Sequence, residues 1–552
     1  MGTIADKLTY LGQTKAEIRD AIIAKGVTIP EKTTFREFAK KIREISADDG
    51  EENPVEWKRP DEWLRIDDRI KEGEDKFIGL YAIFEDSNFI TLAATGDYTV
   101  DWGDGKIENF SSGSLASHFY SYEQFEKTEG SLGYRQAIVT VTPQKEHVLT
   151  SISLRERHPN VDAGSYSSGW LDIRVSGESI SEFLISGGAV SHRYLESFCF
   201  LGHSSIIDFT KFFAGCTALQ SVSLSRSTSK GEKFSQMFQE CLTLKYVPSF
   251  DTTSGVDFSS MFASCYDLQT VGLLETSRGR DFSYMFQNCF SLQTIPLFDT
   301  TEGVTFFNMF MACVALKTIP LLNTANGTDF GYMFGTCILL KTIPLLNLAN
   351  GRNFEYMFAS CYGLETIPLL DMSKGDSFYA MFANCSSLKS IPLIDTSSGT
   401  NFFAMFTNCS ALKTIPPINT GNGSVFSNMF GSCTRLETIP YLDTSSGVDF
   451  SSMFFNCSAL VSIPVLKAGK GASFIGMFAD CENLSKASLA EIRKSVDYSS
   501  CKLSRNALAD IFKHLGSGED RPTITISNNW GVPFLAPEDR DVALKKGWDI
   551  AE

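Results

Sequence analysis

Six histidines, at positions 118, 147, 158, 192, 203 and 514, are the first candidates for catalysis or metal binding in this 552-residue chain. None of them stands in an HExxH or HxxEH pattern, and neither a CxxC pair nor a Cys/His cluster with zinc spacing occurs. A GxSxG motif is also absent, and the glycine-containing stretches lack the lysine of a phosphate-binding loop. Asp and Glu are abundant, so a hydrolase with paired carboxylates stays open. The chemistry-bearing residues favour a protein that is not an enzyme and that uses no cofactor and no metal.

Cysteine is the most regular of the reactive residue types. The chain has 14 cysteines, and from Cys241 to Cys481 they recur every 24 residues without exception. Residues at the same place in successive repeats stack on one another, and a buried free cysteine behaves as a small hydrophobic residue. We therefore interpret this set as a structural ladder inside a core, in preference to disulfides or metal ligands. The ladder comprises Cys241, Cys265, Cys289, Cys313, Cys337, Cys361, Cys385, Cys409, Cys433, Cys457 and Cys481.

The same period organises the whole segment 201–484, here called the repeat array. In the copy FFNMFMACVALKTIPLLNTANGTD, at 306–329, Phe, Met, Phe and Cys are spaced i, i+3, i+4 and i+7, which predicts a short helix. Leu316, Ile319 and Leu321 then follow the spacing of a leucine-rich repeat, and they predict a strand of about 317–319 that the next proline ends or bends. A polar turn follows, in which Gly327 can adopt positive φ. One coil cannot bury its apolar stripe alone, so the pattern predicts an α/β solenoid of about twelve stacked coils.

Lysine and threonine side chains recur on the predicted strands of this solenoid. Such a face is either an ordinary solvated surface or a polar ladder that binds a glycan or a protein through shallow, repeated contacts. The candidate ligand-binding residues are Lys317, Thr318, Lys341, Thr342, Lys389, Lys413 and Thr414.

The repeats closely resemble BspA-like leucine-rich repeats. The resemblance rests on near copies of DTSSGTNFFAMFTNCSALKTIP, at 395–416, and it departs from the family in the I-P-x-L ending and the S-x-G link. It implies a surface adhesion or recognition module without catalytic residues. Asp371, Asp395 and the aspartates equivalent to them are interpreted as turn-forming groups.

The segment before the array contains several alternating stretches. Two helices with capping boxes are predicted within 1–46, an acidic linker over 47–60, and a β-rich domain over 61–200. Strands are predicted at 77–84, 89–95, 98–102, 137–143 and 171–177. The VDWGDG turn at 100–105, followed by His-Phe-Tyr at 118–120, resembles a PKD-type immunoglobulin-like β-sandwich. Asp101 and Asp104 could bind calcium, but formation of the turn is the preferred interpretation.

Residues 485–552 differ again from the repeats. Two helices are predicted, over 488–501 and 503–516, followed by a strand near 523–529 and an A-x-x-K-G-W ending. This C-terminal cap resembles the caps of repeat arrays in tailed-phage virion proteins, and residues 1–46 are similar to an opening segment of phage tail and fibre proteins. The chain is therefore predicted to be a multidomain α+β protein dominated by the solenoid.

The two ends favour a non-enzymatic virion protein of a tailed phage, either a tail fibre or a receptor-binding protein. The alternatives are a head fibre or capsid decoration protein, and a bacterial BspA-like surface adhesin. Residues 1–10 do not resemble a secretory signal, which favours assembly in the host cytoplasm over export to the cell surface. The expected partners are other virion proteins at 1–46 and a host surface glycan or protein, and fibre proteins imply a homo-oligomer. A net charge of −16 argues against nucleic acid, and the absence of a long apolar run argues against membrane insertion.

Overall fold

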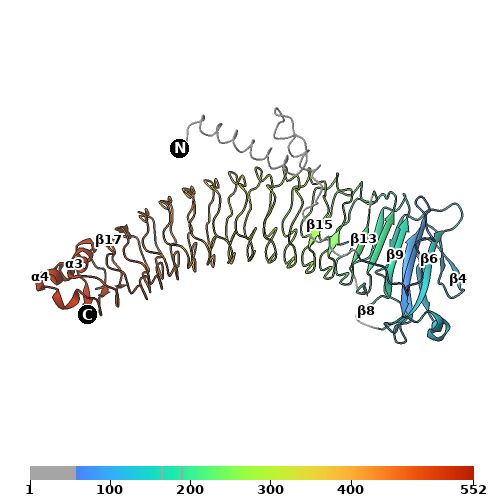
Figure 1. Ribbon diagram of the computed structural model, residues 1–552, viewed down its shortest axis with the longest axis horizontal. Helices are drawn as coiled ribbons and strands as arrows, with labels where there is room; N and C mark the ends of the chain where they lie inside the picture. Colours follow the sequence, from blue (N-terminus) through green and yellow to red (C-terminus); the bar gives the residue numbers. More distant parts are fainter. Residues whose placement is uncertain (1–56, 163–165, 188–189, 225) are drawn as a thin grey trace, which may run out of the picture. The chain divides into compact units, whose positions relative to one another are not determined.

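The computed structural model describes residues 57–162, 166–187, 190–224 and 226–552. The helical anchor predicted for 1–46 and residues 47–56 of the linker lie outside this part of the chain. The described residues form a β-sheet region followed by a stack of coils, with helices α3 and α4 at its far end (Figure 1).

Two β-sheets share one core at the start of the described chain. A seven-stranded sheet has the order β13-β12-β9-β1-β6-β3-β4, and a four-stranded sheet has the order β10-β7-β2-β5. The five segments predicted as strands coincide with β1, β2, β3, β6 and β9. The bounds are β1 Lys76–Ile83, β2 Phe89–Thr95, β3 Tyr98–Asp101, β4 Ile107–Phe110, β5 Leu115–Phe119, β6 Arg135–Pro143, β7 Ser151–Ser153, β8 Tyr166–Ser167, β9 Trp170–Ser176, β10 Glu182–Leu184, β11 Val190–Ser191, β12 Ser197–Leu201 and β13 Ser221–Ser223, with a 3-10 helix at Tyr122–Thr128.

Strand β9 joins the sheet region to the solenoid. It pairs antiparallel with β1 on one side and parallel with β12 on the other, and β12 in turn pairs parallel with β13. The sheet therefore continues across residue 200, where a domain boundary was predicted, and one hydrophobic core runs from Phe77 to Trp548. Further turns extend the repeats at both ends, so the leucine-rich-repeat-like solenoid has about fifteen turns of 24–25 residues rather than twelve.

The short helix predicted in each repeat is wrong. Residues 306–313 and their equivalents, here called the turn run, form successive tight turns in which the third and seventh positions have positive φ, as in Asn308 (58°) and Ala312 (61°). The N–H of Asn308 donates to the carbonyl of Gly331 in the next coil (2.9 Å), whereas the N–H of Met309 donates to Phe306 in its own coil (3.1 Å). Left-handed residues interrupt a helix, but successive four-residue turns produce the same apolar spacing. The turn run therefore links every coil to the next through its backbone.

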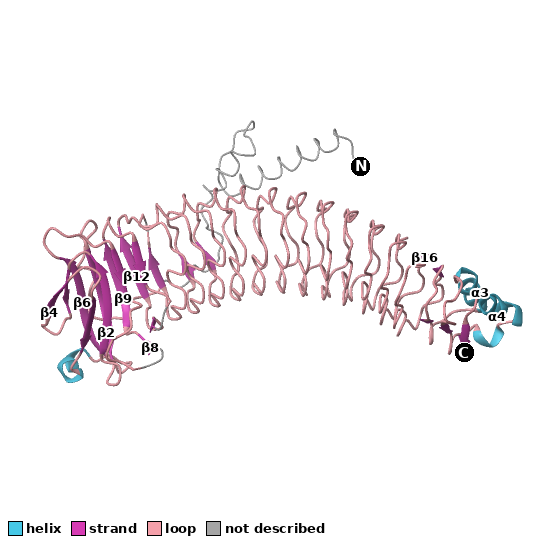
Figure 2. Cartoon of the chain, turned by 180° about the vertical axis from the view of Figure 1, so that it is seen from behind, coloured by secondary structure: helices cyan, strands magenta, loops and turns pink. Residues whose placement is uncertain are grey.

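Within the described repeats, the strand predicted at 317–319 and its equivalents is assigned only at β13, β14 and β15, where Leu224 and Gly272 interrupt the proline column. Strands β14 (Tyr246–Val247) and β15 (Thr270–Val271) pair because Gly272, at the proline position, donates its N–H to Val247 (2.7 Å). A proline there has no N–H to donate. Among the described repeats, assigned strands return only at β16 (Leu466–Lys467) and β17 (Leu489–Ala490), so the coils between are drawn as loops (Figure 2).

Buried residues in the segment after the turn run recur every three positions. Leu316, Ile319 and Leu322 are buried, whereas Leu321, expected in the core, is 56% exposed. A period of three is that of a polyproline II conformation, which agrees with the recurring proline and the missing strand hydrogen bonds. We call residues 317–323 and their equivalents the Pro segment.

Two columns of stacked phenylalanine rings fill the solenoid core. The first column runs from Phe209 to Phe474 with ring centroids 5.4–5.9 Å apart. The second runs from Phe213 to Phe478 and ends on Tyr498, 4.8 Å from Phe478. Gly327, predicted to be free to take positive φ, does not adopt it and has another role, because a Cβ there would lie 2.4 Å from the Phe330 ring.

The C-terminal end closes the stack with a small sheet and two helices. Strands β18 (Val496–Asp497), β19 (Thr523–Thr525) and β20 (Asp549–Ala551) pair in parallel, and α3 (Arg505–His514), α4 (Pro537–Lys545) and a 3-10 helix (Val532–Phe534) lie between them in sequence. Helix α3 and strand β19 agree with the prediction, and the Ser504 side chain caps α3 by accepting from the Ala507 N–H. The helix predicted over 488–501 is wrong, since this stretch holds β17 and β18, and Glu491 and Ser500 have positive φ.

Candidate binding faces of the repeat array

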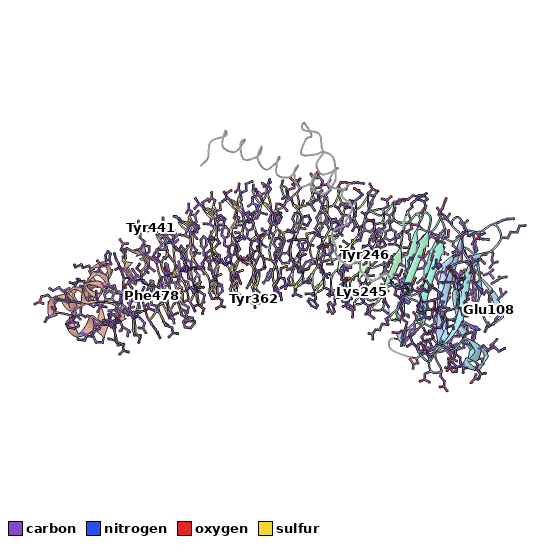
Figure 3. The ribbon with its side chains drawn as sticks, viewed as in Figure 1. Glu108, Lys245, Tyr246, Tyr362, Tyr441 and Phe478 are labelled. Carbon is purple, nitrogen blue, oxygen red and sulfur yellow. The ribbon has the colours of Figure 1, made fainter. Side chains whose placement is uncertain are left out.

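The predicted ligand-binding residues lie in one exposed strip on the Pro segments. All seven side chains are exposed, and they lie in two neighbouring columns, here called the Lys–Thr ladder. Lys245 and Tyr246 occupy the same two columns in an earlier coil and lie side by side in Figure 3. The core therefore does not require the side chains of the ladder, and they are available to a partner.

Charge on the ladder is partly balanced from coil to coil. The Lys389 ammonium lies 2.5 Å from Glu365, and the Lys413 ammonium lies 3.3 Å from Glu437. Lys389 holds the pKa of Glu365 below its ordinary value through a side-chain hydrogen bond and charge attraction. Exposed pairs of this kind contribute little to stability and are weakened by salt, so they can exchange for contacts with a ligand.

A column of exposed apolar side chains follows the prolines, and the sequence analysis did not identify it. It was missed because Leu321 was grouped with Leu316 and Ile319 in the apolar spacing of a leucine-rich repeat. The column comprises Leu321 (56% exposed), Leu345 (50%), Leu369 (61%), Leu393 (62%) and Tyr441 (52%). Tyr441 and Tyr362, which directly follows a turn run, lie at different edges of the array in Figure 3.

The cysteine ladder is buried and hydrogen-bonded. Each of its eleven thiols donates to the carbonyl oxygen of the second phenylalanine in the preceding coil, at 2.9–3.3 Å, as Cys337 does to Phe310. Burial raises the pKa of these thiols, to about 12 for Cys361. A protonated, enclosed thiol is neither a nucleophile nor a metal ligand, so the ladder serves the core.

Thiol titration should find all fourteen cysteines free. No cysteine in the described residues forms a disulfide, and Cys199 alone among the fourteen is not fully buried. Denatured protein without reductant should therefore react at about fourteen thiols with Ellman's reagent, whereas the native protein should react slowly and mainly at Cys199. A denatured protein with few free thiols would contradict the ladder.

The aspartates considered as possible acids or calcium ligands close turns. Asp395 accepts the N–H of Ser397 (2.9 Å), and Asp371 accepts that of Ser373 (3.1 Å). In the VDWGDG turn, Asp101 accepts the N–H of Gly103 (3.0 Å).

Asp104 has a second partner. It accepts the N–H of Lys106 (2.9 Å) and also contacts Nε2 of His118 (2.8 Å), whose ring stacks on Trp102. His118 thereby ties the turn to β5, which gives this motif a structural role. Within the described ranges, no group of three or more His, Cys, Asp or Glu side chains could hold a metal ion. No helix in the described part of the chain is long and apolar enough to cross a membrane.

Several solved structures are similar to this chain. A leucine-rich repeat protein from Bacteroides ovatus is 18% identical, with a TM-score of 0.41 over 63% of this chain and 96% of its own. A leucine rich cell surface protein from Faecalibacterium prausnitzii is 17% identical, with a TM-score of 0.30 over 59% and 90%. The pneumococcal vaccine antigen PcpA is 11% identical, with a TM-score of 0.23 over 73% and 93%. At these identities and scores the likeness does not extend to function.

Comparison with curated proteins gives no match. One family model matches the repeats three times, at residues 201–295, 280–391 and 376–491. The matches cover the repeat array and the first turn beyond it, and they begin after most of the β-sheet region. Since together they span more than half of the 552 residues, the chain belongs to the family described as "Mycoplasma protein of unknown function, DUF285".

Proposed function

We propose that this protein is a non-enzymatic recognition protein of the BspA-like adhesin type, in which the repeat array presents a regular surface to a partner. The observation that carries the proposal is the Lys–Thr ladder, whose exposed side chains recur at the same places in four coils, two on either side of the Glu365 coil. Backbone bonds between turn runs hold the coils in register, so contacts made at successive coils are linked in one body. Linked weak contacts give an avidity that no single coil would have.

Display on a bacterial cell surface is the location we propose. The BspA-like character of the repeats supports it, whereas the phage-virion alternative depends on motifs at the two ends. One of these, the predicted anchor at 1–46, lies outside the described residues, and none of the relatives named above is a phage protein. Antibody labelling of intact cells should detect the protein. Its purification with phage particles and not with the cell surface would contradict the proposal.

The ladder is tested by reversing its charge. Changing Lys317, Lys341, Lys389 and Lys413 together to Glu should abolish binding to the cells that the wild type binds, because the ladder then repels acidic partners and loses its donors. Exposed sites tolerate substitution, so the melting temperature should fall by no more than a few degrees. The matched control makes the same charge change at exposed lysines outside the ladder, Lys230, Lys374, Lys470 and Lys494. Equal binding by the ladder variant and the control variant would place the site elsewhere.

A further inference from the structure

Six consecutive coils carry an aromatic side chain on the outer side of the turn run. Each is half-buried, and each contacts the next, at centroid separations between 4.3 Å (Tyr332 to Tyr356) and 6.1 Å (Phe307 to Tyr332). We call this set the aromatic strip, which comprises Tyr284, Phe307, Tyr332, Tyr356, Tyr379 and Phe403.

The repeat does not require these rings. The strip uses the first or second position after the first phenylalanine of the coil, where the coils outside the strip have no aromatic residue and mostly Ser, Gln, Asn or Gly. Tyr284, Tyr332 and Tyr356 have φ of 59°, 53° and 55°, a left-handed conformation that is unfavourable for a side chain with a Cβ. Asn308 and Asn428 hold the same conformation at the same position, and asparagine adopts it more readily. Bulky residues retained in an unfavourable conformation point to a role beyond folding.

A row of amides and hydroxyls runs beside the strip. The seventh position of the turn run holds Thr336, Ser360, Asn384 and Asn408 in four consecutive coils. The amide of Asn408 donates to that of Asn384 (2.7 Å), which donates to Ser360 (3.3 Å).

Small residues separate this row from the rings. Ala380, Ala383 and Ala404 are buried beneath Tyr356, Tyr379 and Phe403. In these four coils, Glu355 is the one charged residue among the second, third, sixth and seventh positions of the turn runs. The surface therefore offers aromatic rings, hydroxyls and amides with little charge.

We propose that the aromatic strip and its polar row bind a linear, uncharged polysaccharide that lies along the stack of coils. Sugar rings present C–H groups to aromatic side chains and hydroxyls to amides. Tyr332 stacks on Tyr356 and Tyr379 stacks on Phe403, so each of these rings has the other face or the ring edge left for a sugar. The inference rests on the proposed function, since it names the ligand class that a recognition protein of this shape would bind.

The period of the strip favours a polysaccharide over a peptide. Same-face residues of a β-strand repeat at about 6.6–6.8 Å, and a polyproline II helix repeats at about 9.3 Å. Neither matches ring separations of 4.3–6.1 Å. A chain of pyranose rings linked through opposite carbons advances by roughly one sugar per coil, so successive sugars meet successive coils in the same way.

The test uses the full chain and a panel of soluble neutral polysaccharides: a starch-type glucan, a β-1,3-glucan, a soluble β-1,4-glucan and a mannan. Affinity gel electrophoresis should show that the wild type binds at least one of them. The variant Tyr332→Asn with Tyr356→Asn should bind that polysaccharide at least tenfold more weakly. Its melting temperature should be unchanged or higher, because asparagine suits positive φ, and loss of binding then cannot be attributed to unfolding.

The four-lysine variant described above should keep its affinity for the polysaccharide. The proposal is overturned if the wild type binds no member of the panel, or if the double Asn variant binds as the wild type does. It is also overturned if sedimentation shows that the strip instead joins two copies of the chain. Cell binding lost in the lysine variant, with no polysaccharide binding by the wild type, would retain the proposed function and reject this inference. Polysaccharide binding by the wild type, with cell binding unchanged in the lysine variant, would retain this inference and reject the role proposed for the Lys–Thr ladder.

Discussion

Replacing Phe358 by Ala should lower the free energy of unfolding by about 3–5 kcal/mol, the usual range for a buried aromatic residue. Phe358 is fully buried, and its ring stacks between those of Phe334 (5.6 Å) and Phe382 (5.4 Å). Its removal leaves a gap in the second phenylalanine column that neighbouring side chains cannot fill without moving. Urea denaturation followed by tryptophan or tyrosine fluorescence measures the loss.

The damage should also be local. Coils contact mainly their neighbours, so hydrogen exchange should accelerate in the coils next to Phe358 and remain nearly unchanged near both ends. Tyr362→Ala in the same coil is the matched control, because Tyr362 is 49% exposed and should cost far less. Uniform acceleration of exchange over the whole chain, or equal effects of the two substitutions, would contradict the nearest-neighbour account.

Gly327→Ala should be the second most damaging of these changes, although it adds a single methyl group. The new Cβ would lie 2.4 Å from Cζ of Phe330 and 3.0 Å from Cε2 of Phe306, both within the stacked column. Overpacking of this kind typically costs about 1–3 kcal/mol.

Gly335 in the next turn run provides the comparison. A Cβ there would approach nothing closer than 3.4 Å, and the equivalent positions hold Ala359 and Ala383. Gly335→Ala should therefore leave the melting temperature almost unchanged. Similar melting temperatures for the two variants would show that the glycine column does not serve close packing against the rings.

The period, the core columns and the main strands could be predicted from the sequence, because each follows from local pattern. Phe, Met, Phe and Cys at fixed places must stack once coils stack, and the apolar runs of β1 and β2 are almost entirely buried. The path of the backbone between these side chains could not be predicted in the same way. The spacing i, i+3, i+4 and i+7 is shared by a helix and by successive four-residue turns.

A weaker signal distinguishes the two conformations. Asn288, Asn384, Asn408, Asn456 and Asp480 directly precede cysteines of the ladder, and all have positive φ. Asn and Asp are enriched in left-handed backbone, so their recurrence before the cysteine indicates a turn.

The exposed apolar column after the prolines and the aromatic strip could not be predicted for another reason. Leu321 and Leu322 are both leucine, and the sequence alone does not show whether the segment alternates every two or every three residues. The aromatic strip is a departure from the repeat consensus, so analysis of what the coils share passes over it.

The central claim is that the turn runs hold the coils together and leave the Pro segments free to bind a partner. Amide hydrogen exchange resolved to short peptides tests it most directly. The N–H groups of Phe306, Asn308, Phe310 and Ala312 donate to the next coil at 2.7–2.9 Å. Within the described residues, those of Thr318, Ile319 and Leu321 form no backbone hydrogen bond to another coil.

Peptides covering 306–313 should therefore exchange orders of magnitude more slowly than peptides covering 317–323. The contrast should recur in the coils from Pro296 to Pro440, where at most the first N–H of the Pro segment donates to the preceding coil, as that of Glu365 does to Lys341 (3.0 Å). Equal protection of the two segments would mean that the Pro segments form a continuous hydrogen-bonded sheet. That result would contradict both the turn-run account and the availability of the Pro segments.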